Sequence, residues 1–400
     1  LGTESGTSCR RARVTQRSPL PNALTLPTYR AEKTDIWKQS LRNCATILQS
    51  RSPALEEQDI LFRSNSAIYQ DHVSKNIARN GGRSLKRKDA QGSGANSVSI
   101  MAAITHPSQL ANPLATVAKL ETTASQLQVI PQDIEHFARF DAARLTQAAG
   151  ILLRLPQEII AQSIIILQRF YVGADGGSLL EHDLLNSSAA SLYLCAKPSE
   201  TPVSARQVLT VLSYLESTNG DFSQAARSDG EFSPAERHLT QGQYEVKRDQ
   251  LYLAESEILR VLGFQTHVAL PYTLCINYLQ TLEVFSGPEG SALAKRAFAH
   301  LNSALLSPQL LYLTHQPSAI ATAAIYLAAR EVDAKLPEAE WWEVFDVDRE
   351  ELGFLVVALL SLEGFALERQ EAFGGKVGLL TQEKLRSILE AGVANGVGAS

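Results

Sequence analysis

AASLYLCAK (Ala189–Lys197) and TAAIYLAAR (Thr322–Arg330) are the stretches that decide the fold of this 400-residue chain. Both are rich in small residues, both carry Tyr-Leu one turn before a terminal cation, and they lie 133 positions apart. A helix that is apolar on nearly every side is typical of the buried centre of a helical bundle. The two stretches therefore indicate a helical unit that occurs twice.

A second pair of segments supports this repeat. EILRVLGF (Glu257–Phe264) and ALLSLEGF (Ala358–Phe365) both close in Gly-Phe, 101 positions apart. The two offsets differ by 32, which is the length of the polar segment Glu216–Lys247. The simplest interpretation is one all-helical unit used twice, with a loop inserted in the first copy. Chance similarity between short apolar helices is the alternative.

Helical spacing of apolar residues continues from about Leu114 onward, and strands with clean alternation are missing. A first helix is expected after Val129-Ile130-Pro131. The other helices expected in the first unit are Pro156–Phe170, Leu179–Lys197, Pro202–Leu215 and Tyr244–Phe264. After a short link (Gln265–Leu270), those of the second unit are Pro271–Phe285, Pro288–Leu306, Ser318–Val332, Glu338–Phe345 and Asp348–Phe365. The sequence thus predicts an all-α fold of two five-helix bundles, with a loose tail over residues 370–400.

Charge is distributed unevenly along the chain. The first hundred residues have a net charge of +8, and the remaining 300 have a net charge of −13. Residues 1–113 have the composition of a disordered basic arm, and the run RSLKRK (Arg83–Lys88) fits a nuclear address, a nucleic-acid patch or simply a solvated tail. The only methionine is Met101, where the regular pattern begins, and no function is assigned to the residues before it. The acidic balance of the rest disfavours non-specific DNA binding, which needs a cationic face.

Several classes of function lack their signatures. The four cysteines (Cys9, Cys44, Cys195 and Cys275) form no close pair, so neither a disulfide framework nor a zinc site is expected. No apolar run is long enough to span a membrane, and the first residues are not a signal peptide. Catalytic motifs for acyl transfer, zinc proteolysis or phosphate binding are missing. The chain is therefore expected to have no enzymatic activity, cofactor or metal.

Two charged residues conflict with the amphipathic pattern of their helices. Glu255 shares a stripe with Leu251 and Ile258, so its carboxylate needs a partner or becomes costly to bury. Lys197 ends its helix in line with Tyr193, so its aliphatic stem emerges from a buried face. Ordinary roles remain open, since Lys197 also complements the helix dipole and Glu255 could reach water at the rim.

Four motifs in order resemble the cyclin family, and within it the L-type transcriptional cyclins. They are QAAGILLRLPQ (Gln147–Gln157), YLCAKPSETPVSARQVL (Tyr193–Leu209), AESEILRVLGFQTHVALPY (Ala254–Tyr272) and PSAIATAAIYLAAR (Pro317–Arg330). The likeness covers about 125–369, and its first motif is specific to the subfamily. The Arg/Ser-rich tail of animal L-type cyclins is missing, so the chain looks like a fungal-type member, and association with splicing factors is in doubt.

The resemblance implies tandem cyclin boxes over 124–264, with an insertion at 216–247, and over 265–369. It also implies that Lys197 and Glu255 are the Lys and Glu with which cyclins bind backbone groups of a cyclin-dependent kinase. Glu200 is the one acid that remains where the family has two after the lysine. The expected protein is a nuclear regulatory subunit of a Ser/Thr kinase that acts on RNA polymerase II or RNA processing, with no nucleic-acid or membrane partner.

Two alternative functions stay open at this point. The first is a promoter-binding core that resembles transcription factor IIB, which would need a cationic groove on the helical units. The second is a helical scaffold that binds no kinase at all. Retention of a stoichiometric kinase on purification distinguishes both from a cyclin.

Overall fold

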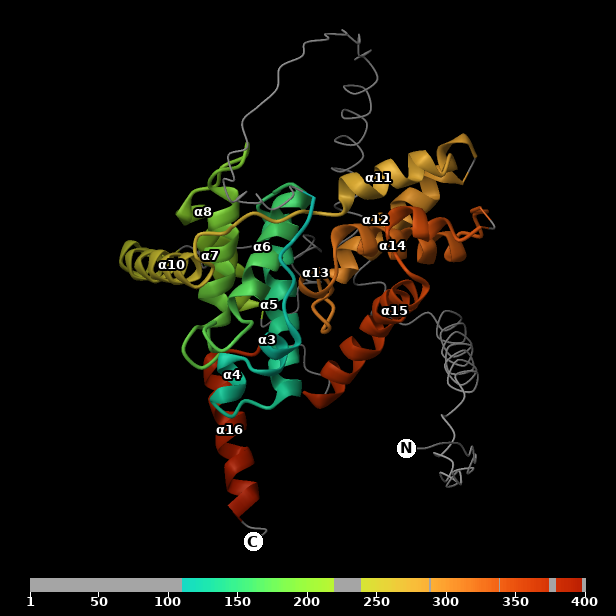
Figure 1. Cartoon of the computed structure of the whole chain (residues 1–400). Helices are drawn as coiled ribbons and strands as arrows, with labels where there is room; N and C mark the ends of the chain where they lie inside the picture. The colour runs from blue at the N-terminus through green and yellow to red at the C-terminus, as the bar shows by residue number, and fades with distance from the viewer. Residues whose placement is uncertain (1–109, 219–238, 288, 338, 374–378, 398–400) are drawn as a thin grey trace, which may run out of the picture. The chain divides into compact units, whose positions relative to one another are not determined.

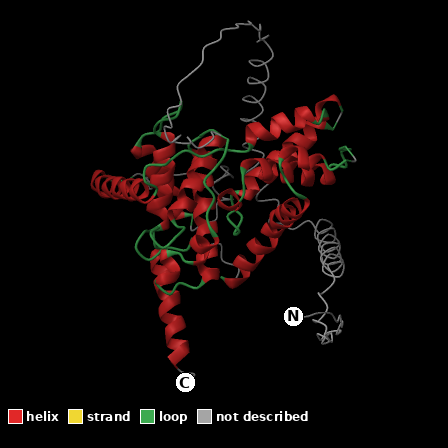
Figure 2. Ribbon diagram, viewed as in Figure 1, coloured by secondary structure: helices red, strands yellow, loops and turns green. Residues whose placement is uncertain are grey.

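A computed structural model describes residues 110–218, 239–287, 289–337, 339–373 and 379–397. Over these ranges the secondary structure is entirely helical and contains no strand (Figure 2). The predicted all-α class is therefore confirmed. The expected disordered arm, 1–113, falls outside the described residues up to position 109, as does most of the insertion, at 219–238. The last residues of the arm are ordered instead, because Asn112 is buried and hydrogen-bonded.

The helices follow one another along the chain as Figure 1 shows, coloured from cyan to red. In order they are α3 (Val117–Glu121), α4 (Ala124–Leu127), α5 (Gln132–Leu152), α6 (Gln157–Phe170), α7 (Leu184–Ala196), α8 (Ala205–Ser217), α10 (Gln241–Val261), α11 (Tyr272–Thr281), η2 (Val284–Ser286), α12 (Gly290–Ala304), α13 (Leu311–Thr314), α14 (Pro317–Glu331), η3 (Trp341–Phe345), α15 (Arg349–Ala372) and α16 (Gln382–Val397).

Helix α7 is the centre of the first bundle, where it contacts α5, α6, α8 and α10. Its side chains are mostly small, and Ser188, Ala190 and Ala196 are fully buried. Small residues let four neighbours approach one helix closely. The same requirement holds between α5 and α6, since a Cβ at Gly150 would lie 2.5 Å from the Cγ1 atom of Ile160.

Helix α14 has the corresponding position in the second bundle, where it contacts α11, α12, α15 and η3. It begins 133 residues after α7, the same offset that the sequence shows. The predicted duplication of a helical unit therefore holds for the central helices.

Two predicted elements differ most from the structure. The fourth helix expected in the second bundle, Glu338–Phe345, is only the short 3-10 helix η3, with Trp341 and Phe345 buried. The tail expected to be loose after residue 370 contains helix α16. Leu380 and Leu385 are buried and hold the start of this segment against the core, so its apolar residues have a packing role.

Two buried contacts join the bundles. The side chain of Asn112 pairs with both backbone groups of Ala269, at 2.8 Å each, while its own backbone pairs with the amide of Gln316. In the second contact, Arg369 of α15 donates to Asp141 of α5 at 2.6 Å, and the N–H of Leu380 donates to the same carboxylate oxygen. These contacts span more than 150 residues of sequence and stabilise the pairing of the two copies.

Candidate functional site

Lys197 and Glu255 lie side by side on two packed helices. The Nζ atom of Lys197 donates to Oε1 of Glu255 at 2.6 Å, although 58 residues separate them in the chain. Lys197 is the C-terminal cap residue of α7, and Glu255 lies in α10, which packs against α7. The sequence showed that both charged residues conflict with the amphipathic pattern of their helices, and the structure brings them together.

The position of Glu255 follows from the apolar stripe of α10. Leu251 and Ile258, one turn before and after it, are fully buried, and Glu255 is 8% exposed. A carboxylate in such a stripe is stable only with a charged or hydrogen-bonding partner. Lys197 supplies that partner, which explains why an acidic residue is tolerated there.

The pair is accessible from one side. The side chain of Lys197 is 51% exposed, whereas that of Glu255 is 10% exposed. The hydrogen bond that Lys197 donates to Glu255 raises the pKa of Lys197, so the ammonium stays charged at neutral pH. An ammonium has three donors and a carboxylate has two acceptor oxygens. One bond between them leaves donors and acceptors for the backbone of a partner.

Aromatic residues that the sequence did not single out as functional surround this pair. Lys197 Nζ lies 5.3 Å from the ring centroid of Tyr193, whose ring centroid is 6.1 Å from that of Tyr252. Tyr252 is 43% exposed. An exposed aromatic side chain beside a charged pair is typical of a protein–protein interface. The surface formed by Tyr193, Lys197, Tyr252 and Glu255 is called the α7–α10 surface below.

Glu200, the third predicted site residue, is not part of this pair. It is exposed in a bend three residues after Lys197. No hydrogen bond or ion pair joins it to Lys197 or Glu255 in the described part of the chain. Its assignment stays a prediction, because a flexible exposed carboxylate can reach a partner without a bond inside its own chain.

Other kinds of site are not found in the described ranges. No group of His, Cys, Asp or Glu side chains there is arranged to hold a metal ion. Cys195 and Cys275 are buried and unpaired, and burial raises the pKa of each thiol to about 12. No described helix is both long and apolar enough to cross a membrane.

The buried pair between Asp141 and Arg369 was missed from the sequence. Both side chains are almost inaccessible, at 2% and 3% exposure. Asp141 lies near Phe137 and Phe140 in α5, so the signal that revealed Glu255, an acid among apolar neighbours, was present there too. Its partner is 228 residues away, which no local pattern indicates. The pair joins the bundles and is not accessible to a ligand.

No protein-family model matches the chain. Curated proteins do match it. Human cyclin-L2 is 31% identical over 254 residues, mouse cyclin-L2 is 32% identical over 254 residues, and zebrafish cyclin-L1 is 30% identical over 245 residues. These alignments cover 61–63% of this chain but only 45% of each relative. The chain therefore spans less than half the length of the relatives it matches.

Two solved structures are similar in coordinates at low sequence identity. A chain of the yeast RNA polymerase II CTD kinase complex CTDK-1 is 14% identical, with a TM-score of 0.49 over 65% of this chain and 76% of that one. A chain of the CAK complex from Chaetomium thermophilum is 17% identical, with a TM-score of 0.39 over 84% of each. The sequence relatives confirm the resemblance to the L-type cyclins that the four motifs predicted.

Proposed function

We propose that the chain is a regulatory subunit, without catalytic activity of its own, that binds and activates a cyclin-dependent Ser/Thr protein kinase. The observation that carries the proposal is the Lys197–Glu255 pair, buried on one side and open on the other. The cyclin-L relatives support it. The proposed cyclin boxes cover 124–264 and 265–369, and α15 continues three residues past the second.

The chemistry of the α7–α10 surface suits this function. Lys197 would donate to backbone carbonyls of the kinase, and Glu255 would accept from its backbone N–H groups. Both bonds strengthen when the interface excludes water. Tyr252 would cover an apolar side chain of the same kinase element. Contact with the regulatory helix of the kinase would then press it inward and align its Lys–Glu pair for phosphoryl transfer.

The proposal extends to the cellular compartment of the kinase and to its substrates. We infer that the kinase acts in the nucleus, on RNA polymerase II or on RNA-processing factors. The resemblance of the four sequence motifs to the L-type transcriptional cyclins supports this inference. Purified complexes incubated with ATP and a peptide of the polymerase tail would test it, and a complex that phosphorylates only unrelated substrates would contradict it.

The direct test is a reversal of the charged pair. Lys197→Glu together with Glu255→Lys keeps an ion pair within the chain but presents the wrong charge to each kinase group. We expect the double variant to fold like the parent chain and to lose the co-purified kinase. Unchanged kinase binding by the folded double variant would contradict the proposal.

The chain provides a matched control on the same helix. Arg260 and Glu257 form an exposed pair at 2.8 Å, one helical turn apart in α10. Arg260→Glu with Glu257→Arg changes the same number of charges on a different part of that helix. This variant should retain the kinase, because exposed pairs contribute little and do not face the proposed partner.

A promoter-binding role, the first alternative, receives no support from charge. The net charge of −13 over residues 101–400 opposes contact with DNA phosphates. The second alternative, a scaffold that binds no kinase, predicts that the reversed pair has no effect on any partner. The same co-purification experiment therefore distinguishes it from the proposed function.

A further inference from the structure

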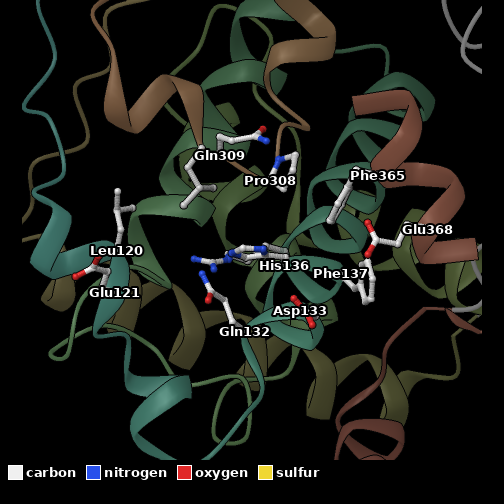
Figure 3. Close-up of a pocket in the computed structure, with 12 residues that line it drawn as sticks. Leu120, Glu121, Gln132, Asp133, His136, Phe137, Pro308, Gln309, Phe365 and Glu368 are labelled. Carbon is white, nitrogen blue, oxygen red and sulfur yellow. The ribbon is translucent and has the colours of Figure 1, made fainter. Parts of the chain in front are cut away.

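A cavity of about 360 Å³ opens between α3, α5, α15 and the segment before α13. Figure 3 shows His136 in the middle of the opening, with Leu120 and Glu121 on one side and Phe365 and Glu368 on the other. Pro308 and Gln309 lie across from Gln132. The volume is at the lower end of the range typical of ligand pockets.

The rim of this cavity is acidic. Glu121, Asp133 and Glu368 are all exposed and line it, and no ion pair to any of them is found among the described residues. His136 does not offset them, since burial, together with the charge of Arg139, lowers its pKa to about 4 and leaves it neutral at pH 7. The opening therefore attracts a cationic group.

The wall of the cavity is aromatic. The ring centroids of Phe137 and Phe365 lie 5.4 Å apart, and the planes are tilted by 37°. A planar guanidinium stacks on an aromatic ring and also pairs with carboxylates at its edge. An ammonium pairs with carboxylates but has no planar face to stack. Aromatic walls with an acidic rim thus favour an arginine side chain over other cations.

The inner end of the cavity needs a hydrogen-bond acceptor. Arg139 is 7% exposed, and burial lowers its pKa. Its Nη2 atom pairs with Glu135 at 3.3 Å, while its Nε and Nη1 atoms have no partner in the described part of the chain. A hollow of about 10 Å³ next to Arg139 shares His136, Pro308 and Leu310 with the cavity, and it has room for about one oxygen atom.

We propose that this cavity binds an arginine-bearing peptide segment. The guanidinium of the peptide stacks on the half-buried ring of Phe365, which Phe137 supports from behind, and pairs with Glu368 and Asp133, and a backbone carbonyl of the peptide accepts from Arg139. A free polyamine satisfies the acidic rim but has no acceptor for Arg139, so the peptide is the better fit. The proposal is independent of kinase binding, because it uses none of the residues of the α7–α10 surface.

The test is a titration of the full chain by ligand-detected NMR with acetyl-Ala-Arg-Ala-amide. The matched probe replaces arginine by citrulline, which has almost the same shape but no charge, and spermidine is the free-amine probe. We expect saturable binding of the arginine peptide, at least about fivefold weaker binding of the citrulline peptide, and weaker binding of spermidine. Glu368→Gln should weaken the arginine peptide about two- to fivefold.

Glu350→Gln is the control variant, since Glu350 is exposed on the same helix and does not line the cavity. It should leave the affinity unchanged, and thermal unfolding should show that both variants fold. Equal binding of the arginine and citrulline peptides, or equal effects of the two variants, would overturn the proposed site. Spermidine that binds as tightly as the arginine peptide would overturn the assignment of a peptide.

Discussion

Equivalent positions in the two bundles hold different residues, and the difference separates function from packing. At the 133-residue offset, Lys197 corresponds to Arg330, which is exposed in the last turn of α14. At the 101-residue offset, Glu255 corresponds to Val356, which is 4% exposed. The first bundle has a cation and an acid in contact, whereas the second has an exposed cation at one of these positions and a buried apolar residue at the other.

The second bundle forms without an equivalent charged pair, so the fold itself does not need the Lys197–Glu255 pair. The second bundle builds the same junction of helices with a valine, which packs without any partner charge. The buried acid of the first bundle therefore has a role other than packing. Its proposed role is to bind a kinase, and four predictions test the contrast between the bundles.

The largest effect is expected when the acid of the first bundle is copied into the second. Val356→Glu places a carboxylate in the core, and no lysine ends α14 at the matching distance. The free energy of unfolding should fall by about 3–5 kcal/mol, as for other unpaired buried charges. Chemical denaturation measures it, and Val356→Thr, with a similar shape, is the milder control. A fully stable Val356→Glu variant would mean that this site is open to water.

The second prediction compares the two cations. Lys197→Ala should weaken kinase binding by about 2–5 kcal/mol, because it also strands polar groups on the partner. Arg330→Ala should leave kinase binding unchanged, since Arg330 is outside the proposed surface. Surface plasmon resonance with the co-purified kinase measures both affinities. Similar losses for the two variants would remove the functional distinction between the bundles.

The third prediction concerns Glu331, the residue after that second cation. Burial alone would raise its pKa, but hydrogen bonds from His300 and Arg296, with their charges, outweigh burial and hold the pKa at about 2. A depressed pKa stabilises the fold above the ordinary value of about 4.3, and this stability is lost as the pH falls toward 2. The contribution is about 2–3 kcal/mol.

The variant Glu331→Gln isolates this effect from the titration of other acids. At pH 7 it should be less stable than the parent chain by that amount, and the difference should shrink between pH 4.5 and pH 2. Urea unfolding at several pH values measures the difference. A gap that is constant with pH would show that the carboxylate charge of Glu331 does not matter.

The smallest effects are expected at the glycines of the two Gly-Phe pairs. Gly263 has φ = 56°, a conformation that alanine adopts with strain, and α10 has already ended at Val261. Gly364 lies inside α15 with open space where a Cβ would be. Gly263→Ala should therefore destabilise the chain by about 1 kcal/mol, and Gly364→Ala should stabilise it by about 1 kcal/mol. Thermal unfolding should show a lower melting temperature for Gly263→Ala and a higher one for Gly364→Ala. Shifts in the same direction would contradict this prediction.

These two glycines also show how far sequence reasoning reaches. The matching letters of the Gly-Phe pairs correctly indicated duplicated helices, but they suggested the same ending for both. The residues that follow decide the matter. ALERQEA continues α15 because its members are strong helix formers, while QTHVALP contains β-branched residues and Pro271. A longer window would have predicted the difference.

The candidate site was predictable only in part. Glu255 and Lys197 were found because each violates a helical pattern, and a violated pattern is a local signal. Tyr252 was missed because an exposed tyrosine violates nothing. Asn112 was missed because its partners, Ala269 and Gln316, lie 157 and 204 residues away. Contacts of that range depend on how the bundles pack, which spacing along the chain does not encode.

The position of Asn112 bears on how the fold is lost. Its side chain and backbone together complete the hydrogen bonding of the link and of the start of α14, and Arg169 donates to it from the first bundle. Opening the link would strand several buried polar groups at once, at a cost comparable to local unfolding. Although the architecture is duplicated, we expect the two bundles to unfold cooperatively. Each bundle expressed on its own should therefore be unstable.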